Sequence, residues 1–317
     1  MNKLKKFLLG SKDKNGFLFG SFIYVMLISL GFVYLYPMLY MLVTSLKSLP
    51  DLLDASVRWI PRSVSMDNFR QAFEVLNFQK AFPDTIQIAL LPALAQTVIC
   101  ALTGYGFARF AFPFKKLLLV LVLLTFIIPP YVLMVPTYTM YSDYGILGSL
   151  SALVLPAVFG QGMKSAIFIL IFMQFFKQTP LSLDEAARVD GAGEMTIFMR
   201  IAVPLAVPAF VVAFLFSFVW YWNETYFTSL YLGSAAMGNA DAMTTLLLEL
   251  AKFEQSYMGY LQSTSGNWAA AFMGESVANE AIKMAATLIT VLPMLVIYFI
   301  LQRQFTESID RTGITGE

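Results

Sequence analysis

The sequence predicts an all-α membrane protein with about six transmembrane helices. Three observations lead to this fold class: 58% of the 317 residues are hydrophobic, only 13% are charged, and the mean hydropathy is +0.69. A soluble domain carries about 25% charged residues, so much of this surface is expected to face lipid. A spanning helix needs roughly 20 mostly apolar residues, and the chain contains several such runs.

Six apolar stretches qualify or nearly qualify as spanning helices. They are Gly16–Val43, Thr85–Phe107, Leu117–Val135, Ala152–Phe176, Pro208–Leu230 and Ala281–Leu301. Pro129, Pro130 and Pro156 fall within the third and fourth stretches, where proline bends or breaks a helix. Transporters use broken helices around cavities, but prolines are common in membrane helices generally. The prolines are therefore weak support for a cavity.

Basic residues predict the orientation of these stretches. With both termini inside, the inner segments 1–14, 109–116, 177–207 and 303–317 hold 13 of the 21 Lys and Arg residues, and the outer segments hold 6. Cytoplasmic loops carry an excess of Lys and Arg, so both termini are expected in the cytoplasm. The segment 109–116 gives the strongest support for this orientation, because it has three basic residues and no acidic one.

The composition excludes several classes of function. The chain has no histidine, which removes His-based catalysis and His-ligated metal sites. Cys100 stands alone and cannot form an intrachain disulfide, and a net charge of +1 argues against nucleic-acid binding. The nearest approach to a phosphate-binding loop, 160–165, fails because Val158 and Met163 stand where glycines are required. We expect no catalytic residue, metal or cofactor in this chain, so energy must come from a partner subunit or an ion gradient.

Glu185–Pro204, within the inner segment 177–207, is the most informative part of the sequence, because it is charged and interrupted by glycine between two apolar stretches. Ser182 followed by Glu185 predicts a capping box that starts a helix at Leu183. Gly191-Ala192-Gly193 predicts the end of that helix, since glycine accepts the left-handed conformation found at helix C-termini.

A second helix is expected from Glu194 to Val203, with Pro204 as its end. Ala186 and Ala187 keep one face of the first helix small enough for another protein to approach closely. The two helices would then form a compact knob. In the plainer interpretation, Glu185 only caps its own helix and the alanines are ordinary helix formers.

The spacing of this segment resembles the cytoplasmic EAA loop in permease subunits of binding-protein-dependent ABC importers. That pattern is Glu-Ala-Ala, three residues, Gly, nine residues, Ile, one residue and Leu-Pro. The matching residues are Glu185, Ala186, Ala187, Gly191, Ile201 and Pro204, with Val203 in place of the leucine. The resemblance implies that these residues couple the chain to a cytoplasmic ATPase, where Glu185 can pair with a basic residue.

Aromatic residues surround two polar ones in the fifth stretch. The candidates for a substrate pathway are Trp220, Trp222, Asn223 and Glu224. An ionisable residue within a span usually faces a cavity or a partner, and aromatic rings beside polar groups suit sugars. Trp222-Asn223-Glu224 also resembles the Trp-Asn-acid segment of many sugar-importer permeases. An interfacial aromatic belt, with Glu224 reaching the lipid headgroups, is the equal alternative.

Most of the chain resembles the smaller, maltose-type permease of carbohydrate-uptake ABC importers, from Thr44-Ser45-Leu46-Lys47 to the tail Ser308–Glu317. The resemblance implies a type I ABC importer permease fold in a bacterial plasma (inner) membrane. It also implies a transport subunit, not an enzyme, that forms half of the translocation pathway for a sugar or oligosaccharide. The implied partners are a second homologous permease, an extracytoplasmic solute-binding protein and an ATPase dimer that holds ATP and Mg.

The expected domain organisation has three parts. Residues 1–84 comprise the N-terminal cytoplasmic segment, the first span and an outer loop. Residues 85–306 form the ABC importer transmembrane domain with the EAA loop 177–207, and residues 307–317 form a cytoplasmic tail. The outer segment 233–280 is long for the family, which leaves its contact with the binding protein open. A helix is expected within it at Ala242–Phe253.

Two other functions remain open from the sequence. One is an ion-coupled secondary transporter in which Glu224 and Lys164 are the coupling residues. The other is an ABC importer permease for a non-sugar solute. The sequence identifies neither the sugar nor the subunit that holds the main substrate site.

Overall fold

The computed structural model describes residues 10–11, 14–233, 242–265 and 268–313. The described chain is helical apart from its connections and one antiparallel pair of two-residue strands, β1 (Gly10–Ser11) and β2 (Lys14–Asn15). It divides into two compact units. One contains Met1–Val75 and Tyr257–Ile289, and the other contains Leu76–Ser256 and Thr290–Glu317.

The first unit contains the first expected span as a single helix. α2 (Phe17–Ser45) is 29 residues long, and none of its most apolar stretch is buried within the chain. Such a helix is roughly 43 Å long, which exceeds the hydrocarbon core of about 30 Å. Two shorter helices follow it, α3 (Leu49–Leu53) and α4 (Asp67–Val75).

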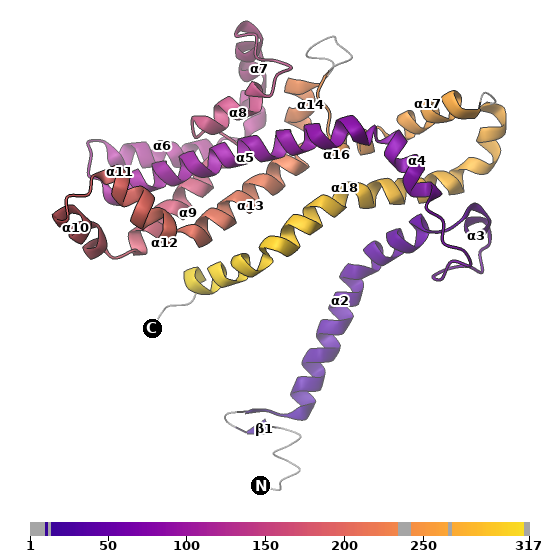
Figure 1. Cartoon of the computed structure of the whole chain (residues 1–317), viewed down its shortest axis with the longest axis horizontal. Helices are drawn as coiled ribbons and strands as arrows, with labels where there is room; N and C mark the ends of the chain where they lie inside the picture. Colours follow the sequence, from indigo (N-terminus) through magenta and orange to yellow (C-terminus); the bar gives the residue numbers. More distant parts are fainter. Residues whose placement is uncertain (1–9, 12–13, 234–241, 266–267, 314–317) are drawn as a thin grey trace. The chain divides into compact units, whose positions relative to one another are not determined.

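The second unit is built around α5 (Phe78–Arg109), which contains the second expected span. α5 packs against α8 (Ser151–Val158), α9 (Ser165–Gln178) and α13 (Val207–Asn223). Figure 1 shows α5, α9 and α13 running alongside one another. Half of the most apolar stretch of α5 is buried, as expected for a helix inside a bundle.

The third expected span is a broken helix. It divides into α6 (Lys115–Ile127), a 3-10 turn η1 (Pro130–Leu133) and α7 (Met134–Asp143). The axis turns by 92° at the break. Pro129 and Pro130 explain this position, because neither residue has the backbone N–H that a continuous helix requires.

The fourth expected span, 152–176, is broken as well, but not at Pro156, where a bend or break was expected. α8 ends at Val158, and α9 begins only at Ser165. Pro156 does not cause the break, since it lies inside α8. In the connecting segment, Gly160 and Lys164 have positive φ angles of 70° and 58°, which a continuous right-handed helix cannot contain.

The fifth expected span, 208–230, is also interrupted. α13 ends at Asn223, and a short helix α14 (Tyr226–Leu232) follows.

The helix expected at Ala242–Phe253 is shorter than predicted. α16 runs over Leu246–Ala251 because the side chain of Thr245 accepts a hydrogen bond from the backbone N–H of Leu248 and caps its start.

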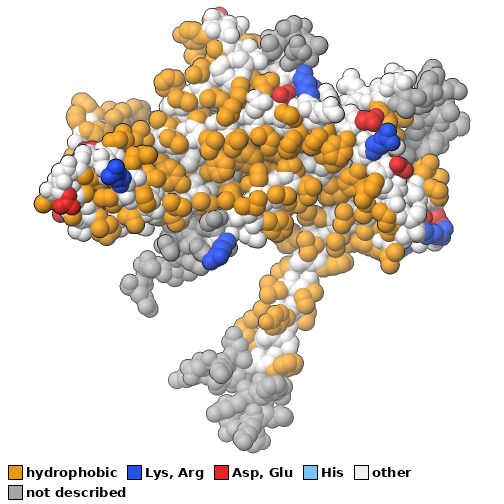
Figure 2. All heavy atoms as spheres, in the orientation of Figure 1, with side chains coloured by type: hydrophobic (Ala, Val, Ile, Leu, Met, Phe, Trp, Pro, Cys, Tyr) orange, Lys and Arg blue, Asp and Glu red, His pale blue; other side chains and the backbone are white. Residues whose placement is uncertain are grey.

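The sixth expected span lies within α18 (Trp268–Gly313), which follows α17 (Phe253–Ser265). By length and composition, α2, α5 and the part of α18 from Glu280 to Arg303 can each cross a membrane, and the described chain has up to six spans if each of three bent helix pairs counts as one. Figure 2 shows hydrophobic side chains covering the visible side of the long helices. Residues 234–241 and 266–267 of the expected outer segment, and 314–317 of the expected tail, lie outside the described residues.

Candidate functional site

The segment 177–207 folds into a helical hairpin. Its first arm is α10 (Leu181–Val189). The second arm consists of α11 (Glu194–Ile197), a π-helical turn η2 (Phe198–Ala202) and α12 (Val203–Leu205). α10 is turned by 71° from α9, and the second arm by 78° from α13. The hairpin therefore leaves the direction of the helices on either side of it, at the end of the bundle labelled α10 and α11 in Figure 1.

The capping box predicted at the start of the hairpin is wrong. α10 begins at Leu181, two residues earlier than expected, and Ser182 lies inside its first turn. Pro180 precedes the helix with φ fixed at −58°, and within the described chain no side chain caps it. The Glu185 side chain therefore does not cap its own helix, and it is exposed.

The glycine turn predicted after α10 is confirmed. The N–H of Ala192 donates to the carbonyl of Ala187 at 2.9 Å, and the N–H of Gly191 donates to that of Arg188 at 3.0 Å. This pair of bonds is the Schellman motif that closes helix C-termini. Gly191 has φ of +83°, in the left-handed region that favours glycine.

We expect Gly191→Ala to loosen the hairpin, because an L-residue in this conformation costs about 1–2 kcal/mol. Gly193→Ala is the matched control: Gly193 has φ of −75°, and an added Cβ at either glycine meets nothing within 4 Å. Hydrogen exchange of the intact complex should show faster exchange over residues 187–197 only in Gly191→Ala. Equal protection in both variants would show that the left-handed turn is not required.

The second arm does not end at Pro204 as predicted. Pro204 lies inside α12, and the chain bends only after Ala206. The π-helical turn η2 precedes the proline. Its wider hydrogen-bond spacing lets the helix continue past Pro204, which has no backbone N–H to donate.

A buried ion pair anchors α10 to the end of α5. Nε of Arg109 lies 3.0 Å from Oδ2 of Asp184, and the two side chains are only 3% and 2% exposed. The contact is a close ion pair without an aligned hydrogen bond. Nη2 of Arg109 also donates to the carbonyl of Thr179 at 3.0 Å. In the sequence, Arg109 stands out only as an inner basic residue, and no local pattern marks Asp184.

Aromatic rings anchor the second arm to the same bundle. The ring centroid of Phe198 lies 4.9 Å from that of Tyr105 in α5 and 6.3 Å from that of Phe176 in α9. Phe198 and Ala202 are both buried in this cluster. Each arm of the hairpin thus has its own attachment to the bundle.

Arg188 and Glu194 join the two arms across the turn. Nε and Nη2 of Arg188 donate to the two carboxylate oxygens of Glu194 at 2.8 and 3.1 Å. These hydrogen bonds hold the pKa of Glu194 below its usual value. A depressed pKa means that the pair stabilises the hairpin at neutral pH and that this contribution is lost as the pH falls through the folded-state pKa. The pair is exposed, so its effect is expected to be small.

The positions that match the EAA pattern lie mostly on the outer side of the hairpin. Glu185, Ala186 and Pro204 are exposed, while Ala187 and Ile201 are half-buried. Exposed apolar side chains lie beside them at the turn, namely Val189 at 88% and Met195 at 63%. Exposed apolar side chains grouped in this way suit a contact with another protein.

A second candidate region lies where the third and fifth expected spans break. The ring of Tyr131, in η1, lies 5.4 Å from the ring of Tyr226 and 5.4 Å from that of Phe227, both in α14. The Tyr226 hydroxyl lies 2.9 Å from Sδ of Met134, which is 92 residues away in the sequence. The two breaks are therefore in contact.

The structure divides the four residues predicted for the substrate pathway into two groups. Trp222 is 3% exposed and packs on Phe218, and Trp220 is half-buried against Phe168. Asn223 is exposed, and its Nδ2 donates to the carbonyl of Val219 at 2.8 Å. The two tryptophans therefore belong to the packed interior, while Asn223 lies at the surface beside the break.

Glu224 has a structural partner at the break. Its Oε1 accepts a hydrogen bond from the backbone N–H of Phe227 at 2.8 Å and so caps the first turn of α14. Two aromatic residues near it were missed from the sequence: Tyr131 and Tyr226, which are 61% and 47% exposed. Pro129 and Pro130, directly before Tyr131, were the available signal.

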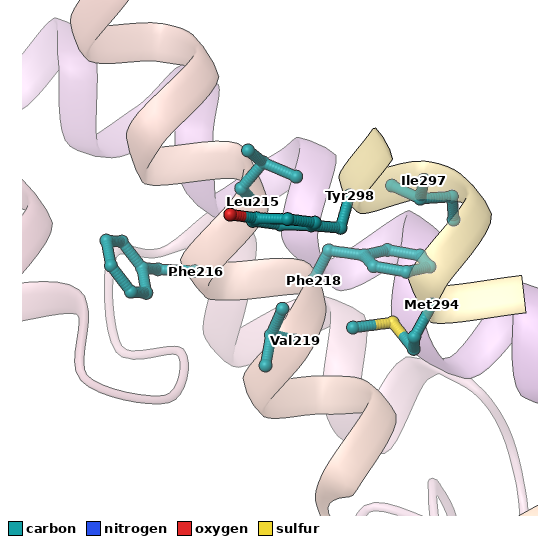
Figure 3. A pocket seen from close by; sticks show the side chains of 7 residues that line it. All are labelled: Leu215, Phe216, Phe218, Val219, Met294, Ile297 and Tyr298. Atoms are coloured by element: carbon teal, nitrogen blue, oxygen red, sulfur yellow. The ribbon is translucent and has the colours of Figure 1, made fainter. Parts of the chain in front are cut away.

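A small cavity between α13 and α18 is a poor place for a sugar. Its volume is about 100 Å³, and Figure 3 shows the ring of Tyr298 lying close to that of Phe218 between the two helices. Seven side chains line it: Leu215, Phe216, Phe218, Val219, Met294, Ile297 and Tyr298. Small-molecule sites need a few convergent polar groups, and this lining is apolar.

Residues 96–311 match the family model described as "Binding-protein-dependent transport system inner membrane component". The polygalacturonan/rhamnogalacturonan transport system permease protein YtcP of Bacillus subtilis is 26% identical, over 94% of this chain and 99% of YtcP. The melibiose/raffinose/stachyose import permease protein MelC of the same organism is 28% identical, over 88% of this chain and 91% of MelC.

A solved structure has the same fold. It is a chain of a bacterial ABC transporter involved in the import of the acidic polysaccharide alginate, with a TM-score of 0.69 and 18% sequence identity. The match covers 96% of this chain and 99% of that chain.

Proposed function

This chain belongs to the family of binding-protein-dependent transport system inner membrane components, and we propose that it is a permease subunit of an ATP-driven ABC importer for a sugar or oligosaccharide. The hairpin 177–207 carries the proposal, since it is anchored to the bundle and presents the EAA positions at its surface. The names of YtcP and MelC both refer to carbohydrates, which supports a sugar as the cargo.

In this proposal, the hairpin transmits the motion of a cytoplasmic ATPase dimer that holds ATP and Mg. The ATPase contacts the outer side at Glu185, Ala186 and Val189. Because the Arg109–Asp184 pair attaches α10 to α5, displacement of α10 pulls on the helix that packs against α9 and α13. A second permease completes the pathway, and an extracytoplasmic solute-binding protein delivers the sugar. The excess of Lys and Arg in the inner segments supports a cytoplasmic hairpin and cytoplasmic termini.

We place the substrate pathway of this subunit beside the paired helix breaks. Asn223 and Glu224 offer polar groups there, and the exposed rings of Tyr131 and Tyr226 offer apolar faces. A sugar needs both, since its C–H faces are apolar and its hydroxyls form hydrogen bonds. An interfacial aromatic belt is the competing interpretation of the same residues.

Glu224→Gln separates these two interpretations. Glutamine keeps an oxygen that can cap α14 but removes the charge, and a hydrogen bond to a charged group contributes about 1.5–3 kcal/mol. We expect uptake at low sugar concentration to fall roughly tenfold while assembly is unchanged. Glu249→Gln is the matched control, because Glu249 is also half-buried and also accepts a hydrogen bond, from Thr244. Wild-type uptake in Glu224→Gln would favour the aromatic belt.

Transport by the reconstituted importer tests the proposed function directly. Proteoliposomes with the partner permease, ATPases and binding protein should accumulate a sugar from a panel only when ATP is inside the vesicles. Uptake driven by an ion gradient without ATP would instead support the secondary transporter with Glu224 and Lys164. Uptake of only non-sugar solutes would keep the importer and reject the sugar.

A further inference from the structure

The loop that follows α2 is held in one conformation by buried charged side chains. Nζ of Lys47 donates to the carbonyls of Val57 and Arg58, each at 2.8 Å. Oδ2 of Asp51 accepts a hydrogen bond from the backbone N–H of Arg62 at 2.9 Å. Lys47 and Asp51 are only 7% and 4% exposed. Hydrogen bonds to ionised groups are stronger than neutral ones, so they fix the loop tip, residues 56–62.

This tip folds back along the spanning helix. The ring centroid of Trp59 lies 5.2 Å from that of Tyr36 in α2. Tyr36 comes nine residues before the end of α2 at Ser45, which corresponds to roughly 13 Å along the helix axis. The tip therefore lies beside the apolar helix and does not extend beyond its end.

The tip combines exposed apolar and cationic side chains. Ile60 is 84% exposed and Trp59 is 41% exposed. Both line a shallow concavity that Arg58 and Arg62 also line. Arg62 is paired with Asp54 at 2.7 Å, whereas Arg58 makes no ion pair within the described chain. Tryptophan beside an arginine is typical of membrane–water interfaces, where the ring sits at the headgroup level.

We propose that residues 56–62 form a lipid anchor at the membrane–water interface, with Trp59 and Ile60 inserted among the lipids and Arg58 against a lipid phosphate. Lipid is the expected contact of this tip, because the tip lies against α2. The most apolar stretch of α2 has no buried residue in this chain. Removing the exposed side chains of Trp59 and Ile60 from water lowers the free energy. The Lys47 and Asp51 bonds hold the tip in the orientation that this contact requires.

Fluorescence quenching in the full importer, reconstituted in nanodiscs, tests the anchor. A fluorescent amino acid is placed at position 60, or as a control at position 70, where Arg70 is exposed on α4 of the same unit. Brominated phospholipid should quench position 60 several-fold more than aqueous iodide does, and position 70 should show the reverse. Quenching of position 60 mainly by iodide would overturn the proposal. Protection of position 60 from both quenchers would also overturn it and indicate a protein partner.

The phosphate contact is tested separately with Arg58→Gln. In nanodiscs containing phosphatidylglycerol, this variant should reduce the lipid quenching at position 60, and Arg70→Gln should leave it unchanged. The same quenching in Arg58→Gln as in the parent protein would overturn the role of Arg58.

Discussion

Asp184→Asn is expected to destabilise the importer strongly and to abolish most uptake. Asp184 and Arg109 are almost completely buried, so removal of the carboxylate leaves the guanidinium inside the protein without a counter-charge. Breaking a buried ion pair in this way costs about 3–5 kcal/mol. Thermal unfolding of the purified complex and ATP-dependent uptake in proteoliposomes measure the two effects. Asp190→Asn is the matched control, because Asp190 is exposed on the same segment, and we expect a change within about 0.5 kcal/mol.

A double variant distinguishes the loss of the counter-charge from the loss of the contact between α10 and α5. Replacing a buried ion pair with apolar residues of similar volume is often neutral, so Arg109→Met with Asp184→Leu should recover most of the lost stability. Recovery of uptake as well would show that the contact acts by holding α10 against α5. If Asp184→Asn alone unfolds at the parent temperature, the ion pair is not buried in the complex and the anchor is contradicted.

The second large effect is expected for Gly104→Ala, at the contact between α5 and α9. A Cβ at this position would lie 2.6 Å from Cβ of Phe172 and 2.9 Å from the backbone of both Ile169 and Met173. Rotation of a side chain cannot relieve contacts with backbone atoms, so the two helices must move apart. Overpacking of this kind costs about 1–3 kcal/mol, and we expect a lower unfolding temperature and less assembled complex.

Gly106→Ala is the control on the same helix. An added Cβ at Gly106 meets nothing within 4 Å, and alanine is favoured over glycine in a helix interior by about 0.5–1 kcal/mol. Gly106→Ala should therefore be neutral or slightly stabilising. Equal stability of the two variants would contradict the close approach of α5 and α9.

The glycine turn of the hairpin could be predicted from the sequence, whereas the contacts of the hairpin with distant residues could not. The turn at Gly191 depends on hydrogen bonds within six residues, so a glycine at the right place predicts it. The Arg109–Asp184 pair joins two segments far apart in the chain and leaves no local pattern.

The break between α8 and α9 also depends on distant residues. Nε2 of Gln96, in α5, donates to the carbonyl of Met163 at 2.6 Å, and the N–H of Met163 donates to the Tyr221 hydroxyl of α13 at 3.1 Å. Backbone groups exposed by a break within a membrane need such partners. A break within 152–176 could therefore be expected from Pro156, but its position after Val158 depends on partners that lie far away in the sequence.

The aromatic residues of the fifth span could have been divided more accurately from helical spacing. Phe218 and Trp222 are four residues apart and share the buried face of α13, whereas Asn223 falls on another face. Selecting residues by chemistry alone placed all four in one site. The contact of Tyr131 with α14 required the tertiary structure.

We propose that the hairpin couples ATP hydrolysis to sugar movement, so a change on its outer side should alter the ratio of sugar imported to ATP hydrolysed in proteoliposomes. Glu185→Lys reverses one exposed charge on the outer side of α10, and Asp143→Lys makes the same change on the exposed surface of α7 as a control. We expect Glu185→Lys to assemble normally and to hydrolyse ATP but to import little sugar, whereas Asp143→Lys should keep the parent ratio. A parent ratio in Glu185→Lys would show that the outer side of α10 does not couple ATP hydrolysis to transport.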